Sequence, residues 1–477
     1  MTDELPLPAA FRLRADDNLT VHQDGRVLLG GAPYRLVRLA GPAAALVGEW
    51  LAGKPVGDGR AAGLLARRLV RAGLLHPVPP LDGPRPAVTV VVPVRDRAGE
   101  LARCLAGLPG GVAVIVVDDA SADPEAVAEV VRAAGARLVR RPVNGGPAAA
   151  RNTGLAHAGT DLVAFLDSDC VPGPDWIEGL LPHFADPAVA VAAPRITADR
   201  PGQGLFARYE NEHSALDMGP RESIVRPGAV VSYLPSAALL VRRAAVGAGF
   251  DESIRVGEDV DLVWRLAADG HHVRYDPSVT VGHQHRTRPR QWLAQRIQYG
   301  GSAGPLAVRH PDKLPAVAVP AASAAAWALL VARRPVAAAA LTAGTTALVA
   351  HRLSEWSDRP WQQAALIGTG STLRTVEVLG RTVTRAWWPL AVPLAAAVPR
   401  LRLPLAAAAV LPTVLAHRRT RPALPLLPWA AVRLTDDVAF SLGLWRSCLR
   451  ERTTRPIRTR LWWHSRDGVT PSGGWGR

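Results

Sequence analysis

Acidic residues near the middle of the chain have a spacing that suggests metal chemistry. In FLDSDC, Phe165 to Cys170, an apolar run ends in Asp167-Ser168-Asp169. In an extended chain the two aspartates point to the same side, and two like charges so close are costly unless a cation joins them. Their oxygens favour Mg²⁺ or Mn²⁺, an ion that also bridges to substrate phosphates. An Asp-X-Asp triplet alone also occurs by chance, so its place at the end of an apolar strand carries the interpretation.

Two further segments are suited to holding a nucleotide diphosphate. Asp118 ends the run VAVIVVD and Asp119 follows it, at a strand end where a carboxylate accepts hydrogen bonds from a base or ribose. In NGGPAAARN, which begins at Asn144, paired glycines allow close approach of a ligand, and Arg151 lies one helical turn further on. Arg151 would reach the diphosphate or brace the acidic cluster. The alternatives are that the aspartates only cap a helix and that Arg151 forms a surface ion pair.

A candidate base and a candidate imidazole ligand follow later in the chain. GEDVDLVWRL opens a predicted helix with Glu258 and Asp259 in its first turn. Acidic residues are common there for dipole reasons alone, but Asp259 would also serve as the general base that deprotonates an acceptor hydroxyl. His283 and His285 end a predicted strand. We expect His283 to complete the metal shell, with a solvent-facing histidine pair as the alternative.

Alternating strands and helices are predicted around these residues. Continuous β-branched runs bounded by turns are typical of strands buried on both faces of a largely parallel sheet. Because ligands of doubly wound α/β sheets lie beyond the carboxyl ends of the strands, the polar residues there are the functional candidates. The predicted strands are 88–94, 112–118, 136–141 and 161–167, and the predicted helices are 100–108, 124–134 and 147–158.

Three regions are predicted along the 477 residues. Residues 1–80 read as a small unit of short strands (18–22, 26–29 and 34–36) and two helices (42–51 and 59–72). A proline-rich linker, HPVPPLDGPRP, precedes the α/β domain of residues 87–305. Residues 306–477 are apolar, basic and predicted to be helical.

The amino-acid composition of the chain limits the kinds of ligand and partner that we expect it to bind. The chain has 56 Lys plus Arg against 41 Asp plus Glu, a net charge of +15, which suits lipid headgroups or a diphosphate substrate. Nucleic acid is not expected, because no nucleic-acid-binding motif is found. Three scattered cysteines indicate neither a disulfide framework nor a zinc site. The acidic, proline-containing N-terminus is unlike a signal peptide, so we expect the catalytic part to stay in the cytoplasm.

Apolar runs in the last third of the chain suggest membrane association. Leu314 to Ala332 is uncharged over 19 residues and just reaches spanning length, whereas Val336 to Ala350 is short. Weaker runs at 387–399 and 403–416 are interrupted by proline. Buried or interfacial helices with Arg and Trp at the headgroups are the alternative to spanning ones. Basic residues flank every run, so charge does not set an orientation.

The ordered set of motifs resembles family 2 glycosyltransferases. It comprises VVVPVRDR, VVDDASAD, NGGPAAARN, FLDSD, SAALLVRRAAVGAGFDE, GEDVDL and the His283 strand, over residues 87–299. The resemblance implies a GT-A fold, a UDP- or GDP-sugar donor, Mg²⁺ or Mn²⁺, and inversion by direct displacement. It implies that Asp119 contacts the nucleoside, that Asp169 binds the metal with Asp167 nearby, and that Asp259 is the base. Further donor contacts are expected from Pro93, Arg95, Asp118, Asn144, Arg151 and Ser168, and acceptor contacts from Ser236 and Glu258.

The arrangement of the three predicted regions points to a narrower group within the family. A small N-terminal unit and an apolar C-terminal region resemble the family members that add β-linked glucose from UDP-glucose to a peptide-derived redox cofactor. Residues 11–77 also resemble winged-helix domains that bind a leader peptide at a sheet edge, although a structural cap or a dimerisation unit fits the same pattern. The stretch QWLAQRIQYG lacks the tryptophan of the Gln-X-X-Arg-Trp motif of processive synthases. Short oligosaccharide transfer is therefore preferred.

Three other hypotheses remain at this point. A membrane enzyme would act on a polyprenyl-phosphate, glycolipid or cell-envelope polysaccharide acceptor. A sugar-nucleotide-binding pseudoenzyme would keep the fold without the chemistry, although the presence of all three key aspartates argues against it. A nucleotidyltransferase would carry a glycine-rich basic signature after the first strand, which VVVPVRDRAGEL does not match.

Overall fold

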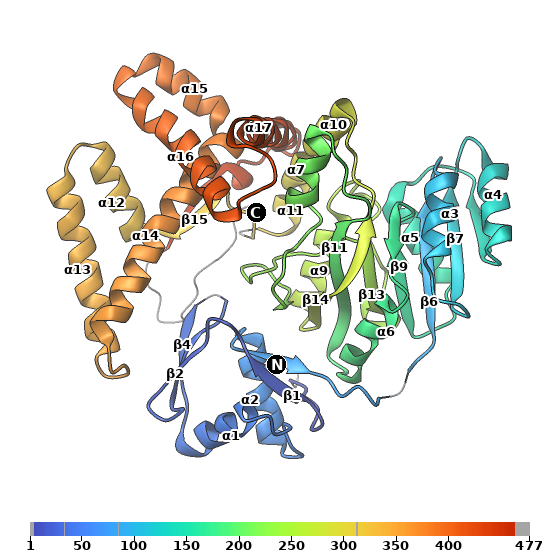
Figure 1. Cartoon of the computed structure of the whole chain (residues 1–477), viewed down its shortest axis with the longest axis horizontal. Coiled ribbons are helices and arrows are strands. Elements are labelled where there is room, and N and C mark those ends of the chain that lie inside the picture. The colour runs from blue at the N-terminus through green and yellow to red at the C-terminus, as the bar shows by residue number, and fades with distance from the viewer. Residues whose placement is uncertain (1–3, 33, 84, 312, 463–477) are drawn as a thin grey trace. The chain divides into compact units, whose positions relative to one another are not determined.

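The computed structural model describes residues 4–32, 34–83, 85–311 and 313–462. Within this part the chain forms two compact units (Figure 1). The first takes residues 1–15 and 49–287, and the second takes residues 16–48 and 288–476, in each case as far as they are described. Because both units draw on residues 1–80, the three-part division expected from the sequence stays a prediction.

A mixed sheet forms the centre of the first unit. Its strand order is β10-β14-β11-β13-β9-β6-β7-β8, and β12 pairs with β14. Strands β6 to β9 are parallel, whereas β13 runs antiparallel to both β9 and β11. The strands are β6 (Val88–Val94), β7 (Ala113–Asp119), β8 (Arg137–Arg141), β9 (Leu162–Leu166), β10 (Cys170–Pro172), β11 (Val189–Ala198), β12 (Ser223–Ile224), β13 (Ala238–Arg242) and β14 (His272–His283).

The parallel half has the strands and helices expected from the sequence. Val90, Val91 and Val92 of β6 are fully buried, as expected of a strand covered on both faces. Gly154 lets a helix approach this strand, because a Cβ there would lie 2.2 Å from Cγ1 of Val91. The helices of the unit are α2 (Arg60–Arg71), α3 (Ala98–Ala106), α4 (Pro124–Ala133), α5 (Gly146–His157), α6 (Trp176–Leu180), η1 (Leu181–Ala185), α7 (Leu205–His213), α8 (Arg243–Val246) and α9 (Glu258–Ala268).

A buried ion pair anchors helix α2 within the first unit. Strand β1 (Arg12–Ala15) pairs with β5 (Leu75–Val78), and α2 precedes β5. The Arg67 guanidinium of α2 donates to both carboxylate oxygens of Asp186, at 2.5 and 2.7 Å, and to the backbone oxygen of Leu5 at 2.9 Å. Its neighbour His272 is neutral, since burial and the Arg67 charge lower the pKa of that imidazole to about 3. Arg67 is thus the buried cation of α2.

The second unit combines a small sheet with helices. The order β2-β3-β4 confirms the short strands expected near the N-terminus. Helices α10 and α17 pack closely because both carry glycine at the contact: a Cβ on Gly300 would lie 1.9 Å from the Phe440 oxygen. Helix α1 (Gly41–Leu51) begins in this unit and ends in the first. The other elements of the second unit are β2 (Thr20–His22), β3 (Val27–Gly30), β4 (Arg35–Arg38), α10 (Pro289–Gly301), α11 (Ala303–Arg309), β15 (Val317–Pro320), α12 (Ala321–Val331), α13 (Pro335–Leu353), α14 (Pro360–Arg385), α15 (Trp388–Ala397), η2 (Pro399–Leu401), α16 (Arg402–Thr420), α17 (Leu426–Arg450), η3 (Arg455–Ile457) and β16 (Thr459–Trp462).

The apolar runs fold differently from expectation. Residues 314–332 do not form one spanning-length helix, because 317–320 pair with β16 as a strand and the following helix has 11 residues. The run judged short becomes α13, which has 19 residues because the helix continues through His351 and Arg352. Within the described residues, α13 and the segment 399–420 are long and apolar enough to cross a bilayer.

We expect Arg67→Met to destabilise the first unit by about 3–5 kcal/mol, since it leaves the Asp186 carboxylate buried and uncompensated. Urea unfolding followed by tryptophan fluorescence measures this. The matched control is Arg68→Ala, an exposed position on the same helix, with a change within about 0.5 kcal/mol. The double variant Arg67→Met/Asp186→Leu should recover part of the loss. Equal midpoints for the Arg67 and Arg68 variants would contradict the anchor.

Candidate active site

Arg151 joins two acidic groups that lie 91 positions apart in the chain. Its side chain, 3% exposed, contacts Asp167 Oδ1 at 2.5 Å and Glu258 Oε1 at 2.9 Å. The Phe250 ring lies 5.4 Å from the guanidinium carbon. These contacts place Arg151 as a brace of the acidic cluster, the second of the two arrangements expected from the sequence. Its Nε is buried without a hydrogen-bond partner among the described residues.

Backbone pairing brings Asp259 to the same edge of the sheet. The Asp167 amide donates to the Ala237 oxygen at 2.9 Å, next to the β9–β13 pair. The adjoining Ser236 amide donates to Asp259 Oδ2 at 3.1 Å. Gly257, with φ +91°, caps α9 in a left-handed conformation that favours glycine and starts the helix at Glu258. One short segment, Ser236-Ala237, thus holds the Asp-X-Asp turn and the candidate base together.

The second aspartate of the triplet lies beside the predicted imidazole. Antiparallel pairing puts Cys170 of β10 opposite His283 of β14, so His283 Nε2 lies 3.4 Å from Asp169 Oδ1. The other Asp169 oxygen accepts from Arg97, a residue that sequence reasoning missed. Burial raises the pKa of Asp169, but the stronger combined effect of His283 and Arg97 lowers it well below its usual range. Asp169 is therefore an ionised carboxylate at neutral pH.

The Asp118-Asp119 pair lies at the carboxyl end of β7 and is neutralised by two arginines of β8. In-register pairing sets Arg140 beside Asp118 and Arg141 beside Asp119, and each pair forms an ion pair. Asp119 also accepts the Gly145 and Gly146 amides, at 3.0 and 2.7 Å. The glycine turn is thus held by Asp119. The parallel spacing of DD and RR at two strand ends was the available sequence signal for these arginines.

The remaining expected donor residues occupy the same edge without joining the acidic cluster. Pro93 and Asp118 each lie one residue before the end of the adjoining strands β6 and β7. Arg95 is half exposed and pairs with Asp96 at 3.4 Å. Asn144 is exposed and accepts the Gly146 amide at 3.0 Å, and Ser168 is buried. Their contacts with a donor stay predictions.

Burial makes the two carboxyl groups at the start of α9 weaker acids than usual. Desolvation, followed by the charge of Asp259, raises the pKa of Glu258 to about 7, while Arg151 opposes the shift. Desolvation also raises the pKa of Asp259, against the Ser236 amide and Arg151. A carboxyl whose pKa approaches neutrality is a better proton acceptor than an ordinary one. Asp259 is therefore a stronger proton acceptor than an exposed aspartate.

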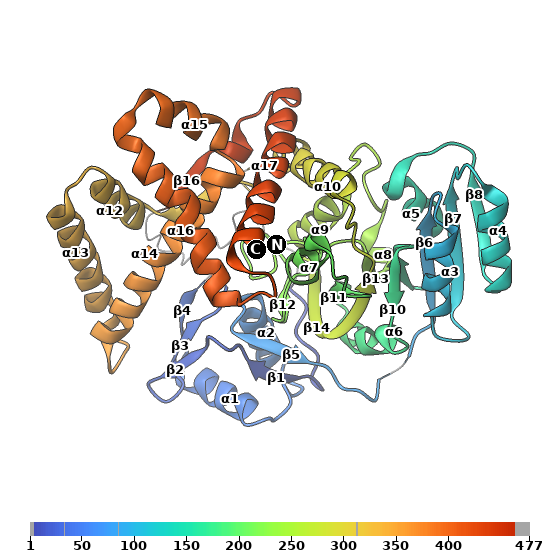
Figure 2. The same ribbon diagram turned by 45° about the horizontal axis from the view of Figure 1, so that its top comes forward.

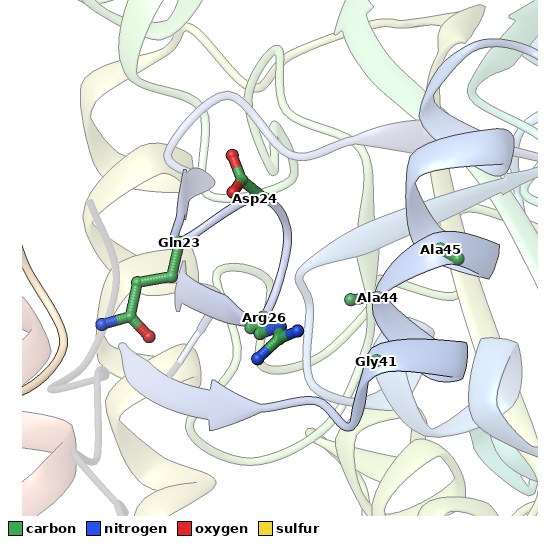
Figure 3. Close-up of a pocket in the computed structure, with 6 residues that line it drawn as sticks. All are labelled: Gln23, Asp24, Arg26, Gly41, Ala44 and Ala45. Atoms are coloured by element: carbon green, nitrogen blue, oxygen red, sulfur yellow. The ribbon is translucent and has the colours of Figure 1, made fainter.

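A separate pocket lies in the second unit. It is bordered by the β2–β3 turn and the start of α1, and Figure 3 shows Arg26 directed toward the helix and Gln23 away from it. The lining residues are Gln23, Asp24, Arg26, Gly41, Ala44 and Ala45. None of the predicted site residues contributes to it. All three cysteines are free and buried, which agrees with the absence of a disulfide framework.

Comparison with known proteins places the chain in a family. The family model for glycosyl transferase family 2 matches residues 89–247. A pre-mycofactocin glycosyltransferase of Mycobacterium tuberculosis is 40% identical over 470 residues, covering 95% of this chain and 98% of the relative. An N-acetylglucosaminyltransferase of Rhizobium meliloti is 27% identical, covering 47% of this chain and 59% of that protein.

Among solved structures, the mannosyltransferase PcManGT of Pyrobaculum calidifontis, in complex with GDP-Man and Mn²⁺, is 20% identical with a TM-score of 0.39, covering 75% of this chain and 89% of that one. The family resemblance and the narrower resemblance in layout are both confirmed by the sequence matches. The chain therefore belongs to glycosyltransferase family 2 and is a glycosyltransferase of GT-A fold.

Proposed function

We propose that this glycosyltransferase transfers glucose from UDP-glucose, with inversion, to a hydroxyl of a peptide-derived cofactor, in oligoglycosylation of the mycofactocin type. The observation that carries the chemistry is that Ser236-Ala237 binds both Asp259 and the Asp167 backbone. The similarity to a pre-mycofactocin glycosyltransferase over 95% of the chain supports the acceptor. UDP-glucose follows from the same resemblance.

Asp169 and His283 fit a divalent cation. Among the described residues no set of three His, Cys, Asp or Glu side chains would hold an ion by itself. An ion of the Mg²⁺ or Mn²⁺ type is commonly held by one or two carboxylates together with substrate phosphates and water. Asp169 with His283, and Asp167 nearby, match that donor set. Bound there, the ion would neutralise the departing nucleoside diphosphate.

Asp259 is proposed as the general base. Its Oδ2 accepts the Ser236 amide and its Oδ1 the Val260 amide, so the carboxylate is held in one orientation. It would take the proton of the acceptor hydroxyl as that oxygen attacks the anomeric carbon from the face opposite the diphosphate. Glu258 and Ser236 would then border the acceptor, while Arg151 keeps Glu258 and Asp167 in place.

The acceptor has two candidate sources. For a peptide-derived acceptor, the sheet β2-β3-β4 has edge strands to which a peptide would add. For a polyprenyl-phosphate, glycolipid or envelope acceptor, the favouring observation is the apolar segments 335–353 and 399–420. We prefer the peptide-derived acceptor and place the enzyme at the cytoplasmic face of the membrane. Incubating the purified protein with labelled UDP-glucose and each acceptor, followed by mass spectrometry, distinguishes them.

Replacing the base should stop transfer without preventing donor binding. We expect Asp259→Asn to lower the rate of glucose transfer by about 10²- to 10⁴-fold, because the amide cannot accept the hydroxyl proton. UDP release and UDP-glucose affinity are measured side by side. The matched control is Asp269→Asn, an exposed position at the end of the same helix, which should keep full activity. Full transfer by the Asp259 variant would exclude this base.

Removing the metal, or its carboxylate, should suppress turnover. We expect EDTA to abolish UDP release and added Mn²⁺ or Mg²⁺ to restore it. Asp169→Asn should raise the Mn²⁺ concentration needed for half-maximal rate by tenfold or more, a change of about 1.4 kcal/mol. Asp161→Asn, at the opposite end of β9, serves as the control and should respond as the parent does. Undiminished activity in EDTA would remove the metal from the proposal.

Arg151 should determine the pH at which kcat/KM falls on the acidic side of its pH profile, the acidic limb. Below its raised pKa the Asp259 base is protonated, so kcat/KM falls as pH drops, and Glu258, with a pKa of about 7, is protonated as pH drops through the neutral range. Removing the cation disfavours both carboxylates and raises their pKa further. We therefore expect Arg151→Met to shift the limb to higher pH and Arg151→Lys to shift it less. An unchanged limb in a folded Arg151→Met variant would contradict the brace.

A further inference from the structure

Two helical hairpins of the second unit have an unusually apolar exposed surface. In the first, α12 leads through a short turn into α13, and in the second, α15 leads through η2 into α16. Val336, Leu403 and Val392 are 82%, 79% and 62% exposed, and α15 has no buried residue. Helix α14 packs against both α13 and α16, so it lies between the hairpins (Figures 1 and 2). Exposed apolar surface of this extent marks an interaction site.

The charges carried by the two hairpins themselves are of one sign. No aspartate or glutamate occurs in residues 313–354 or in residues 378–435, whereas Glu355 and Asp358 follow α13 and Glu377 lies on α14. Each turn carries arginines, namely Arg333 with Arg334 and Arg400 with Arg402, and further arginines lie at the end of α16. Apolar hairpins whose own formal charges are all cationic are complementary to an anionic phospholipid bilayer, to which each surface arginine adds about 1 kcal/mol of attraction.

The first helix of each hairpin is too short to cross a bilayer. Helix α12 has 11 residues, about 16 Å, against a hydrocarbon core of about 30 Å. It continues directly from β15, whose partner β16 leaves Thr459, Arg460 and Leu461 exposed. If the turn of the first hairpin reached the far headgroups, the β15–β16 pair and the exposed Arg460 on it would lie in hydrocarbon. A charged side chain is costly there.

The first helix of the second hairpin is also short, and contacts at its start fix it to the rest of the second unit. Helix α15 has 10 residues and starts next to Trp387, whose indole donates to the Ile457 oxygen at 2.8 Å. Arg385, two positions before Trp387, is ion-paired with Asp437 at 3.0 Å. A spanning hairpin would carry this ion pair toward the middle of the bilayer, where charged groups are costly. Inserting the turns only halfway would instead bury their arginines at that depth.

We propose that the two hairpins lie in the plane of an anionic bilayer, bound to one leaflet and not spanning it. In this orientation the apolar sides of α13, α15 and α16 enter the acyl boundary, while the arginines at the turns reach phosphate headgroups by extending their side chains. The inference deepens the membrane association proposed above and is independent of which sugar and acceptor the enzyme uses. The alternative occupant of the surface is a second copy of the chain.

Vesicle binding tests the lipid and its charge. The full chain should co-sediment with vesicles of phosphatidylcholine and phosphatidylglycerol, and bind pure phosphatidylcholine weakly. The variant Arg333→Glu/Arg334→Glu should bind the anionic vesicles about tenfold more weakly or worse. The control Arg132→Glu/Arg137→Glu, with the same charge change at exposed positions of the first unit, should bind them as the parent does. Equal binding to both vesicle types, or self-association without vesicle binding, would overturn the proposal.

Cysteine labelling tests the in-plane orientation. The native cysteines are buried, so Arg334→Cys at the turn and Ser354→Cys at the end of α13 supply new exposed thiols. With sealed, inside-out membrane vesicles from cells that express each variant, an impermeant maleimide should label both positions from the cytoplasmic side. Labelling from opposite sides would show that α13 crosses the bilayer and would overturn the proposal. Donor turnover, measured in the same samples, reports separately on the enzymatic assignment.

Discussion

The buried guanidinium of Arg151 is the constraint on which the acidic cluster depends. Asp167 and Glu258 are carboxylates from distant elements, and bringing them to one edge of the sheet without a cation would be strongly unfavourable. Arg151 supplies that cation from α5, where Gly154 lets the helix approach Val91 of β6. The position of a charged group needed for chemistry is therefore set by a packing contact between glycine and valine one turn further along the same face of the helix.

Three other carboxylates of the edge each have a cation of their own, whereas Asp259 shares the charge of Arg151. Arg140 and Arg141 neutralise Asp118 and Asp119, and Arg97 contacts Asp169. The four arginines thus offset much of the acidic charge of the edge before any ligand arrives. The roughly two negative charges of a nucleotide-sugar diphosphate are offset by its divalent cation, so donor and ion together add roughly no net charge. Arg97 is one-third exposed and contacts the proposed metal ligand Asp169, so it has room to move from the carboxylate toward a phosphate.

The elements that follow from local pattern were predictable, and the tertiary contacts were not. Strand β6 was predicted residue for residue, because a buried β-branched run has no other low-energy arrangement. Asp167 and Asp259 were found because motif order and strand ends locate them. Arg97 was missed, since an arginine in a loop after a strand has no periodic or spacing signal. Arg67 was missed for a similar reason: its helical pattern is that of a solvent-facing residue, and only the tertiary structure provides Asp186.

The apolar C-terminal runs also show that local sequence pattern does not reveal tertiary contacts. Here the missing contact led to a wrong prediction of helix bounds. Hydropathy counts consecutive uncharged residues, so it joined β15 and α12 into one segment and separated Val336–Ala350 from His351 and Arg352. Strand pairing between β15 and β16 depends on residues more than 130 positions apart, which no window along the chain detects. Once that pairing is in place, the length of α12 determines how far the first turn extends from the sheet. A contact distant in sequence therefore decides whether an alanine-rich helix has the reach to cross a membrane.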